Sequence, residues 1–189
     1  AQCAFPSATQ NEINEVDADN LLAPHYARTA EAIRGRRIVA AQDTTEINLA
    51  GRDKRRRGLG PAGDGVSKGF FIHPVIAIDA DEEAVLGVAA AEIWTREDAP
   101  TPEHHGRPFA DKESARWLRG AVHAAVRLTA AASVVVVGDR ESDIYEVFAA
   151  RPAGIDYVIR ASQDRRLAAG GTLFATTAAF AILGCGLVR

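Results

Sequence analysis

Short hydrophobic runs that end in an aspartate are the clearest pattern in this chain. Residues 134–137 are four consecutive valines with no polar face, and Gly138 and Asp139 follow them. Such a strand must be covered on both sides, as in the centre of a parallel or mixed sheet. A second run, residues 37–42, ends in Asp43. The pattern predicts two buried strands that each place a carboxylate at the carboxyl end, where ligands gather in open α/β sheets.

Other periodicities predict a hairpin early in the chain and helices later. Residues 70–79 and 85–94 are β-rich runs joined by a polar turn, which predicts a β-hairpin. Pro74 must face away from a neighbouring strand or lie at a bulge, and His73 beside it is expected to be structural rather than a ligand. A short helix over residues 25–34 is predicted to end at Gly35 in a left-handed conformation.

The second half predicts two helices and two strands. A helix over residues 111–128 is expected to be capped by Asp111. Its sheet-facing positions, at helical spacing, are Leu118, Ala121, Val122, Ala125 and Leu128. The valine strand, a helix with Ile144, Val147 and Phe148 on one face, and a strand over residues 155–159 follow. The predicted fold is an α/β sheet in the order β-β-β-α-β-α-β.

Composition narrows the class of protein. The chain has 189 residues, 47% of them hydrophobic and 25% charged, with a net charge of −3, which fits one globular domain rather than a wholly basic nucleic-acid coat. Cys3 and Cys185 lie too far apart in the sequence to indicate a metal site or a disulfide framework, so a reducing compartment is expected. The longest apolar run, residues 173–188, is too short and too polar to span a membrane. We therefore expect a cytoplasmic protein with no membrane partner.

One segment concentrates positive charge. The loop over residues 49–68 is rich in glycine and carries Arg52, Lys54, Arg55, Arg56 and Arg57. Such a run is usually a solvated surface loop. Near a pair of carboxylates it could instead neutralise phosphates along a nucleic-acid backbone.

Asp43 and Asp139 are the candidate functional residues. Taken singly, Asp43 could be only a turn or cap residue, and Asp139 could merely begin the next helix. Together, two ionised carboxylates at one sheet edge repel each other unless a cation lies between them. Mg²⁺, with Mn²⁺ as an alternative, is commonly held by one or two carboxylates and a substrate phosphate. The pair therefore favours metal-dependent phosphodiester chemistry.

A phosphatase is an alternative interpretation of the same residues. Gly138, Asp139 and Asp143 after a hydrophobic strand resemble the last motif of haloacid-dehalogenase-type phosphatases, with Asp43 as their nucleophile. Those enzymes have a second acid two residues after the nucleophile. This chain has Thr45 there.

A larger set of motifs resembles the DDE transposases of the insertion-sequence type-four group. The matching features occur in the family's order over about residues 28–166. They are Asp43-Thr44-Thr45, the strand start at Gly69 to His73, Trp94, Asp111-Lys-Glu-Ser114 with Trp117, Asp139-Arg-Glu-x-Asp-Ile144, and Val158-x-Arg160.

The resemblance implies an RNase H-like mixed sheet with flanking helices. It makes Asp43 and Asp139 the first two catalytic acids and metal ligands. It further implies double-stranded DNA as the partner, both transposon ends and target, a homodimer, and a bacterial, nucleoid-associated setting. Arg140, next to Asp139, joins the basic loop as a candidate DNA contact.

The third acid of the family has no counterpart in this chain. It lies on a later helix in a Tyr-x-x-Arg-x-x-x-Glu-x-x-x-x-x-x-Lys pattern, whereas Glu141 and Glu146 follow Asp139 directly and lie on another element. We therefore expect residues 1–24 to be a connecting arm, 25–166 a partial catalytic core truncated before the last catalytic helix, and 167–189 the start of an insertion subdomain or a non-native tail. The absence of methionine also favours a fragment. This predicts an inactive fragment of a transposase, or a non-catalytic inhibitor that binds DNA or an intact transposase.

Overall fold

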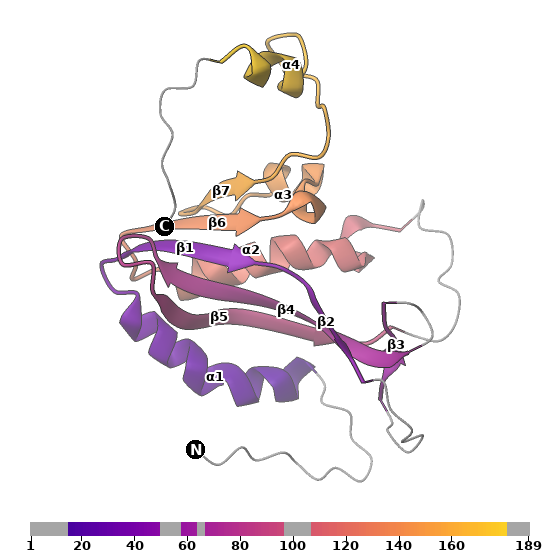
Figure 1. Cartoon of the computed structure of the whole chain (residues 1–189). Helices are drawn as coiled ribbons and strands as arrows, with labels where there is room; N and C mark the ends of the chain where they lie inside the picture. Colours follow the sequence, from indigo (N-terminus) through magenta and orange to yellow (C-terminus); the bar gives the residue numbers. More distant parts are fainter. Residues whose placement is uncertain (1–14, 50–57, 64–66, 97–106, 181–189) are drawn as a thin grey trace.

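The computed structural model describes residues 15–49, 58–63, 67–96 and 107–180, with side chains from residue 22 onward. They form a mixed α/β fold in which helices flank one sheet (Figure 1). The strands are β1 (Arg37–Gln42), β2 (Thr45–Asn48), β3 (Gly60–Pro61), β4 (Lys68–Asp79), β5 (Val85–Trp94), β6 (Ser133–Gly138) and β7 (Asp156–Ile159). The α-helices are α1 (Glu15–Ala32), α2 (Arg116–Arg127), α3 (Tyr145–Ala149) and α4 (Leu173–Ala178). Three 3₁₀ turns are η2 (Phe109–Asp111), η3 (Glu113–Ala115) and η4 (Arg140–Ser142).

The main strands lie side by side in the order β5-β4-β1-β6-β7. The hairpin of β4 and β5 is antiparallel, and β4 is antiparallel to β1. β6 pairs with β1 in parallel, and β7 pairs with β6 in parallel. Parallel neighbours need a crossover, and α2 and α3 lie in the two crossovers. The predicted order β-β-β-α-β-α-β is thus confirmed from β1 to β7, with the short β2 and β3 added.

An interruption separates β1 from β2 at Asp43 and Thr44. Both strands pair with the same edge of β4, and His73 and Pro74 lie opposite the interruption, paired with neither strand. On its other side Pro74 pairs with Ala91 of β5, and the register of that ladder shifts soon after. Because proline has no N–H to donate, it suits a position where the ladder is broken. The expected proline position is confirmed, and it coincides with the place where Asp43 leaves the sheet.

α2 covers one face of the sheet, where the core lies. The helix was predicted to pack through positions that include Leu118 and Val122, but Val122 is 41% exposed. The α2 residues that are buried in its place are Arg116, Trp117, Gly120, Ala121 and Ala124. The packed face is therefore offset by one residue, because Trp117 is fully buried and Gly120 lets Gln42 of β1 approach closely. A Cβ at position 120 would lie 2.4 Å from the Gln42 side-chain oxygen.

The start of α2 also differs from the prediction. Asp111 lies in η2, and α2 begins at Arg116 after a second 3₁₀ turn. The residue before the helix, Ala115, is buried and makes no side-chain cap hydrogen bond. The sequence prediction placed the cap at a nearby polar residue, Asp111. In the structure, burial of Ala115 and Trp117 fixes where the helix starts.

The valine strand is covered fully on one face alone. Val134 and Val136 of β6 are buried in the core beneath α2, together with Ile38 and Ala40 of β1. The alternate positions, which include Val135 and Val137, are half-buried and lie outside this core. In the part of the chain that the structure describes, the expectation that this strand is covered on both faces is therefore not met.

α1 runs along β5, at the edge of the sheet (Figure 1). It begins at Glu15, within the segment predicted as a connecting arm, and is longer than the predicted helix over residues 25–34. Residues 1–14 lie outside the described part. Tyr26 accepts a hydrogen bond at its hydroxyl from the Ala91 N–H, at 3.1 Å, and so satisfies a donor of the edge strand. Gly35 has a φ of 69°, the left-handed conformation predicted for it.

The described helices include none that is long and apolar enough to cross a membrane. α4 and the bridge between Arg166 and Thr172 follow β7 and lie apart from the sheet in Figure 1. They are the described part of the segment predicted to begin an insertion subdomain or tail. Residues 181–189 are outside the described ranges.

Candidate functional site

The two predicted aspartates follow neighbouring parallel strands in matching register. Ala41 of β1 pairs with Val137 of β6, so Asp43 and Asp139 each lie two residues beyond the same rung of the ladder. Both side chains are exposed. Because parallel strands end at one edge, this register brings both carboxylates to the same edge of the sheet.

Backbone amides orient each carboxylate. Asp43 Oδ1 accepts a hydrogen bond from the Thr44 N–H at 2.7 Å, and Asp139 Oδ1 accepts one from the Glu141 N–H at 2.8 Å. Asp139 is therefore the N-cap of η4, as its simpler interpretation predicted. In each carboxylate the other oxygen, Oδ2, makes no hydrogen bond to the described residues.

A hydrogen-bond chain lies directly beneath Asp43. Thr44 Oγ1 lies 3.0 Å from His73 Nδ1, and His73 Nε2 lies 3.3 Å from Gln42 Oε1. Arg116 Nε donates to Thr44 Oγ1 at 2.7 Å. Gln42 Oε1 can only accept, so His73 carries its proton on Nε2, and Nδ1 of the neutral ring accepts from the Thr44 hydroxyl. The ring also packs edge-on against Trp117, with 4.6 Å between the ring centroids.

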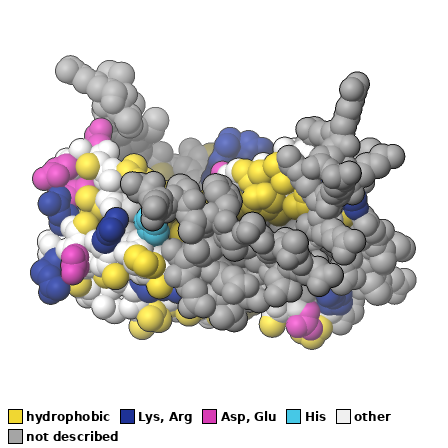
Figure 2. Space-filling model, turned by 90° about the horizontal axis from the view of Figure 1, so that it is seen from below, with side chains coloured by type: hydrophobic (Ala, Val, Ile, Leu, Met, Phe, Trp, Pro, Cys, Tyr) yellow, Lys and Arg dark blue, Asp and Glu magenta, His cyan; other side chains and the backbone are white. Residues whose placement is uncertain are grey.

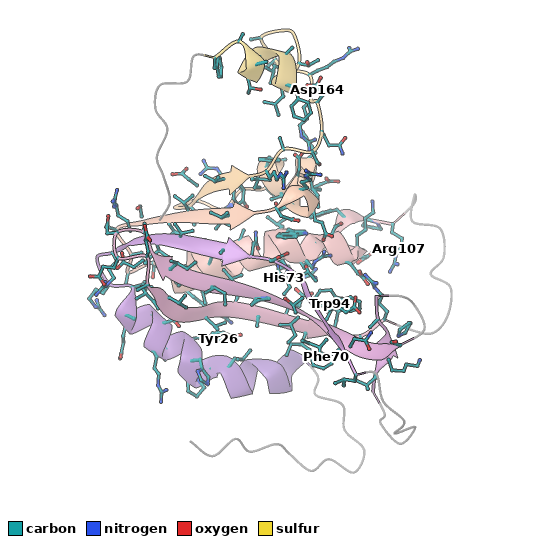
Figure 3. The ribbon with its side chains drawn as sticks, in the orientation of Figure 1. Tyr26, Phe70, His73, Trp94, Arg107 and Asp164 are labelled. Carbon is teal, nitrogen blue, oxygen red and sulfur yellow. The ribbon has the colours of Figure 1, made fainter. Side chains whose placement is uncertain are left out.

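His73 is structural, as the sequence indicated. Figure 3 shows it in the interior, on β4. Burial, together with the positive charges of Arg116 and Arg119, lowers the pKa of His73 from 6.5 to about 3. The imidazole is therefore neutral at physiological pH, which is the form that the hydrogen-bond chain requires.

This low pKa predicts a loss of stability in mild acid. Because the unfolded chain protonates His73 near its ordinary pKa of 6.5 and the folded chain protonates it at about 3, unfolding takes up a proton between these values. We expect the free energy of unfolding to fall by about 2 kcal/mol as the pH decreases from 6.5 to about 4.5. Urea denaturation at a series of pH values measures this slope.

The variant His73→Phe should lose most of that pH dependence, although it is less stable at neutral pH. His25→Gln, at an exposed histidine, is the matched control and should keep the wild-type slope. Asp79 and Asp143, whose pKa values are lowered from 3.8 to about 2, contribute mainly below this window, because the unfolded chain protonates them only near 3.8. An equal slope in His73→Phe and the wild type would contradict the assignment.

Arg116 joins the two strand ends. Besides its bond to Thr44, it donates from Nη2 to Glu141 Oε2 at 2.7 Å. Its guanidinium carbon lies 5.6 Å from the ring centroid of Trp94 and 5.5 Å from that of Trp117. The side chain is 10% exposed, so the ion pair and these cation–π contacts offset the cost of burying its charge.

Asp143 anchors the segment that follows β7. Its carboxylate accepts hydrogen bonds from the backbone N–H groups of Ser162 and Gln163, at 2.6 and 2.8 Å. Arg165 donates to it from Nη2 at 2.6 Å and from Nε at 3.1 Å. Burial by itself would raise the pKa of Asp143, but the hydrogen bonds from Arg165, Ser162 and Gln163 outweigh it and lower the pKa to about 2. Asp143 is therefore held by several hydrogen bonds within the protein and has a structural role, whereas Asp139, four residues earlier, accepts one from the Glu141 N–H.

Of the predicted DNA contacts, only Arg140 lies in the described part of the chain. Its side chain is exposed beside Asp139. Arg52, Lys54, Arg55, Arg56 and Arg57 fall outside the described residues. On the surface that Figure 2 shows, Lys and Arg side chains lie close to Asp and Glu side chains. Arg36 is paired in this way with Asp79 and Glu82.

The candidate site can supply two carboxylate ligands. Within the described ranges, no three side chains of His, Cys, Asp or Glu come together to hold a metal ion. Two carboxylates, each with one oxygen that makes no hydrogen bond to the described residues, still fit an ion such as Mg²⁺ that keeps several waters and also binds a substrate phosphate.

Sequence reasoning missed the residues that support the aspartates. Arg116 is the clearest case. It directly precedes Trp117, and the motifs identified in the sequence include Trp117 and residues 111–114 but not Arg116. An arginine at the start of an amphipathic helix, next to a buried tryptophan, was the available signal. No family model matches the sequence.

Proposed function

We propose that this chain is the RNase H-like catalytic core of a DDE transposase of the insertion-sequence type-four group, whose intact form cleaves and joins DNA. The observation that carries the proposal is the register of β1 and β6, after which Asp43 and Asp139 follow at equal distance from the last shared rung. The strand order β5-β4-β1-β6-β7, antiparallel on one side and parallel on the other, is compatible with an RNase H-like sheet.

In this proposal Asp43 and Asp139 would hold Mg²⁺, or Mn²⁺ in its place. A bound divalent ion would polarise the phosphodiester and lower the pKa of an attacking water or 3′-hydroxyl. The protein's part is to orient both carboxylates, which the Thr44 and Glu141 N–H groups do. Arg140 and the basic loop would contact phosphates of double-stranded DNA.

The described residues offer two acids where the family uses three. We therefore propose that the described part binds a metal ion and DNA without cutting efficiently. A second candidate function follows from the same observation. The chain could act as a non-catalytic partner that occupies DNA or pairs with an intact transposase.

Metal binding tests the proposal most directly. We expect the purified chain to bind Mn²⁺, followed by the electron paramagnetic resonance of the free ion, and Asp43→Asn or Asp139→Asn to weaken binding about tenfold or more. Asp156→Asn is the matched control, because Asp156 has an 82% exposed side chain on the same sheet and lies outside the site.

Nicking of supercoiled plasmid in Mg²⁺ separates the functional alternatives. DNA binding with no nicking would favour the non-catalytic role. Metal-dependent nicking that Asp139→Asn abolishes would favour an active enzyme. Hydrolysis of a phosphate monoester that Asp43→Asn abolishes would favour a phosphatase, and wild-type affinity for Mn²⁺ in both aspartate variants would contradict the metal site.

A further inference from the structure

Arg116 touches the two residues whose amides orient the candidate metal ligands. The Thr44 N–H bonds to Asp43 Oδ1, and the Glu141 N–H bonds to Asp139 Oδ1. Arg116 donates from Nε to the Thr44 side chain and from Nη2 to the Glu141 side chain, each at 2.7 Å. One guanidinium group is thus linked to both carboxylates through one intervening residue on each side.

We infer that Arg116 is a positioning residue that fixes Asp43 and Asp139 relative to each other. Thr44 follows β1 and Glu141 lies in η4 after β6, so the two turns belong to segments that the ladder of β1 and β6 joins. A turn beyond a strand end is freer than the strand itself. The arginine restrains both turns from a third element, the first residue of α2.

The chemistry of the site requires arginine at this position. Its planar guanidinium presents separate N–H groups in a fixed fork, so it can hold a hydroxyl and a carboxylate at the same time. The rings of Trp94 and Trp117 flank it. A lysine would keep the charge but offer one nitrogen, which cannot occupy both the Nε and the Nη2 positions.

Arg116 is poorly suited to bind a substrate phosphate directly. Its side chain is 10% exposed, and Glu141 already neutralises its charge. Its role is therefore to act through Thr44 and Glu141. The catalytic meaning of that role rests on the proposed function, whereas the restraint on the two turns does not.

The test compares Arg116→Lys with Arg119→Lys. Arg119 lies on the same helix and forms a similar ion pair, with Glu92 of β5. We expect Arg116→Lys to accelerate hydrogen exchange of both the Thr44 and Glu141 amides by about tenfold, measured by NMR, and Arg119→Lys to leave both unchanged. Mn²⁺ affinity should fall about tenfold or more in Arg116→Lys alone.

Single-sided variants keep the test usable if Arg116→Lys does not fold. Thr44→Val should expose the Thr44 amide without changing the Glu141 amide, and Glu141→Ala should shift the Arg116 resonances. Unchanged exchange of both amides in folded Arg116→Lys would overturn the inference. If the wild-type chain binds no Mn²⁺, the proposed metal site fails, and the amide exchange still decides whether Arg116 positions the two turns.

Discussion

Trp117→Ala is expected to lower the free energy of unfolding by about 3–5 kcal/mol, the largest effect of any substitution considered. Trp117 is fully buried on α2, and its ring contacts His73 edge-on. A Cβ at Gly138, the residue before Asp139, would lie 3.5 Å from its Cζ3 atom. Removing the indole therefore leaves a cavity beneath both strand ends, which the surrounding sheet cannot close. Urea denaturation at pH 7 measures the loss.

Trp117→Phe is the informative companion variant. The indole Nε1 makes no hydrogen bond to the described residues, so phenylalanine loses volume but no polar contact. We expect it to cost less than about 1.5 kcal/mol. Trp94→Ala is a second control, because Trp94 is only half-buried. Equal losses in Trp117→Ala and Trp94→Ala would show that Trp117 does not support the core as described.

Asp143→Ala is expected to cost roughly 2–4 kcal/mol. The change leaves the N–H groups of Ser162 and Gln163 without their acceptor, and Arg165 without its ion pair. Arg165 is 31% exposed and can be rehydrated, which places the estimate below that for a wholly buried pair. Chemical denaturation gives the size of the loss, and limited proteolysis after residue 160 should become faster.

The matched control for Asp143→Ala is Asp156→Ala. Asp156 also pairs with an arginine, Arg151, but its side chain is 82% exposed. Surface pairs of this kind contribute about 0–1 kcal/mol, so the control should remain close to the wild type. If both variants lose the same stability, the buried hydrogen bonds of Asp143 are not what holds the segment after β7.

The sequence alone predicted the strands and their order well. Hydrophobic runs and alternation located β1, β4, β5, β6 and β7 to within about two residues, because burial in a sheet demands these patterns. The same runs placed Asp43 and Asp139 at strand ends. The break of the ladder near Pro74 was also foreseen, since a missing N–H is a property of the residue itself.

Helix faces and helix starts were predicted less well. The packed face of α2 is offset by one residue, and Asp111 does not cap it, because the fit of Trp117 and Gly120 against the sheet decides both. α1 begins at Glu15 and contains Pro24, which local signals disfavour. These features depend on contacts with distant parts of the chain.

The sequence by itself therefore determined which residues end the strands, while the tertiary structure decided what surrounds them. The parallel register that makes Asp43 and Asp139 neighbours joins segments almost a hundred residues apart, and no local pattern encodes it. The links of Arg116 to Thr44 and Glu141 span 72 and 25 residues. Periodicity indicates whether a side chain is buried. Its hydrogen-bond partners depend on where the folded chain brings each group. The residues that support Asp43 and Asp139 were therefore found only in the structure.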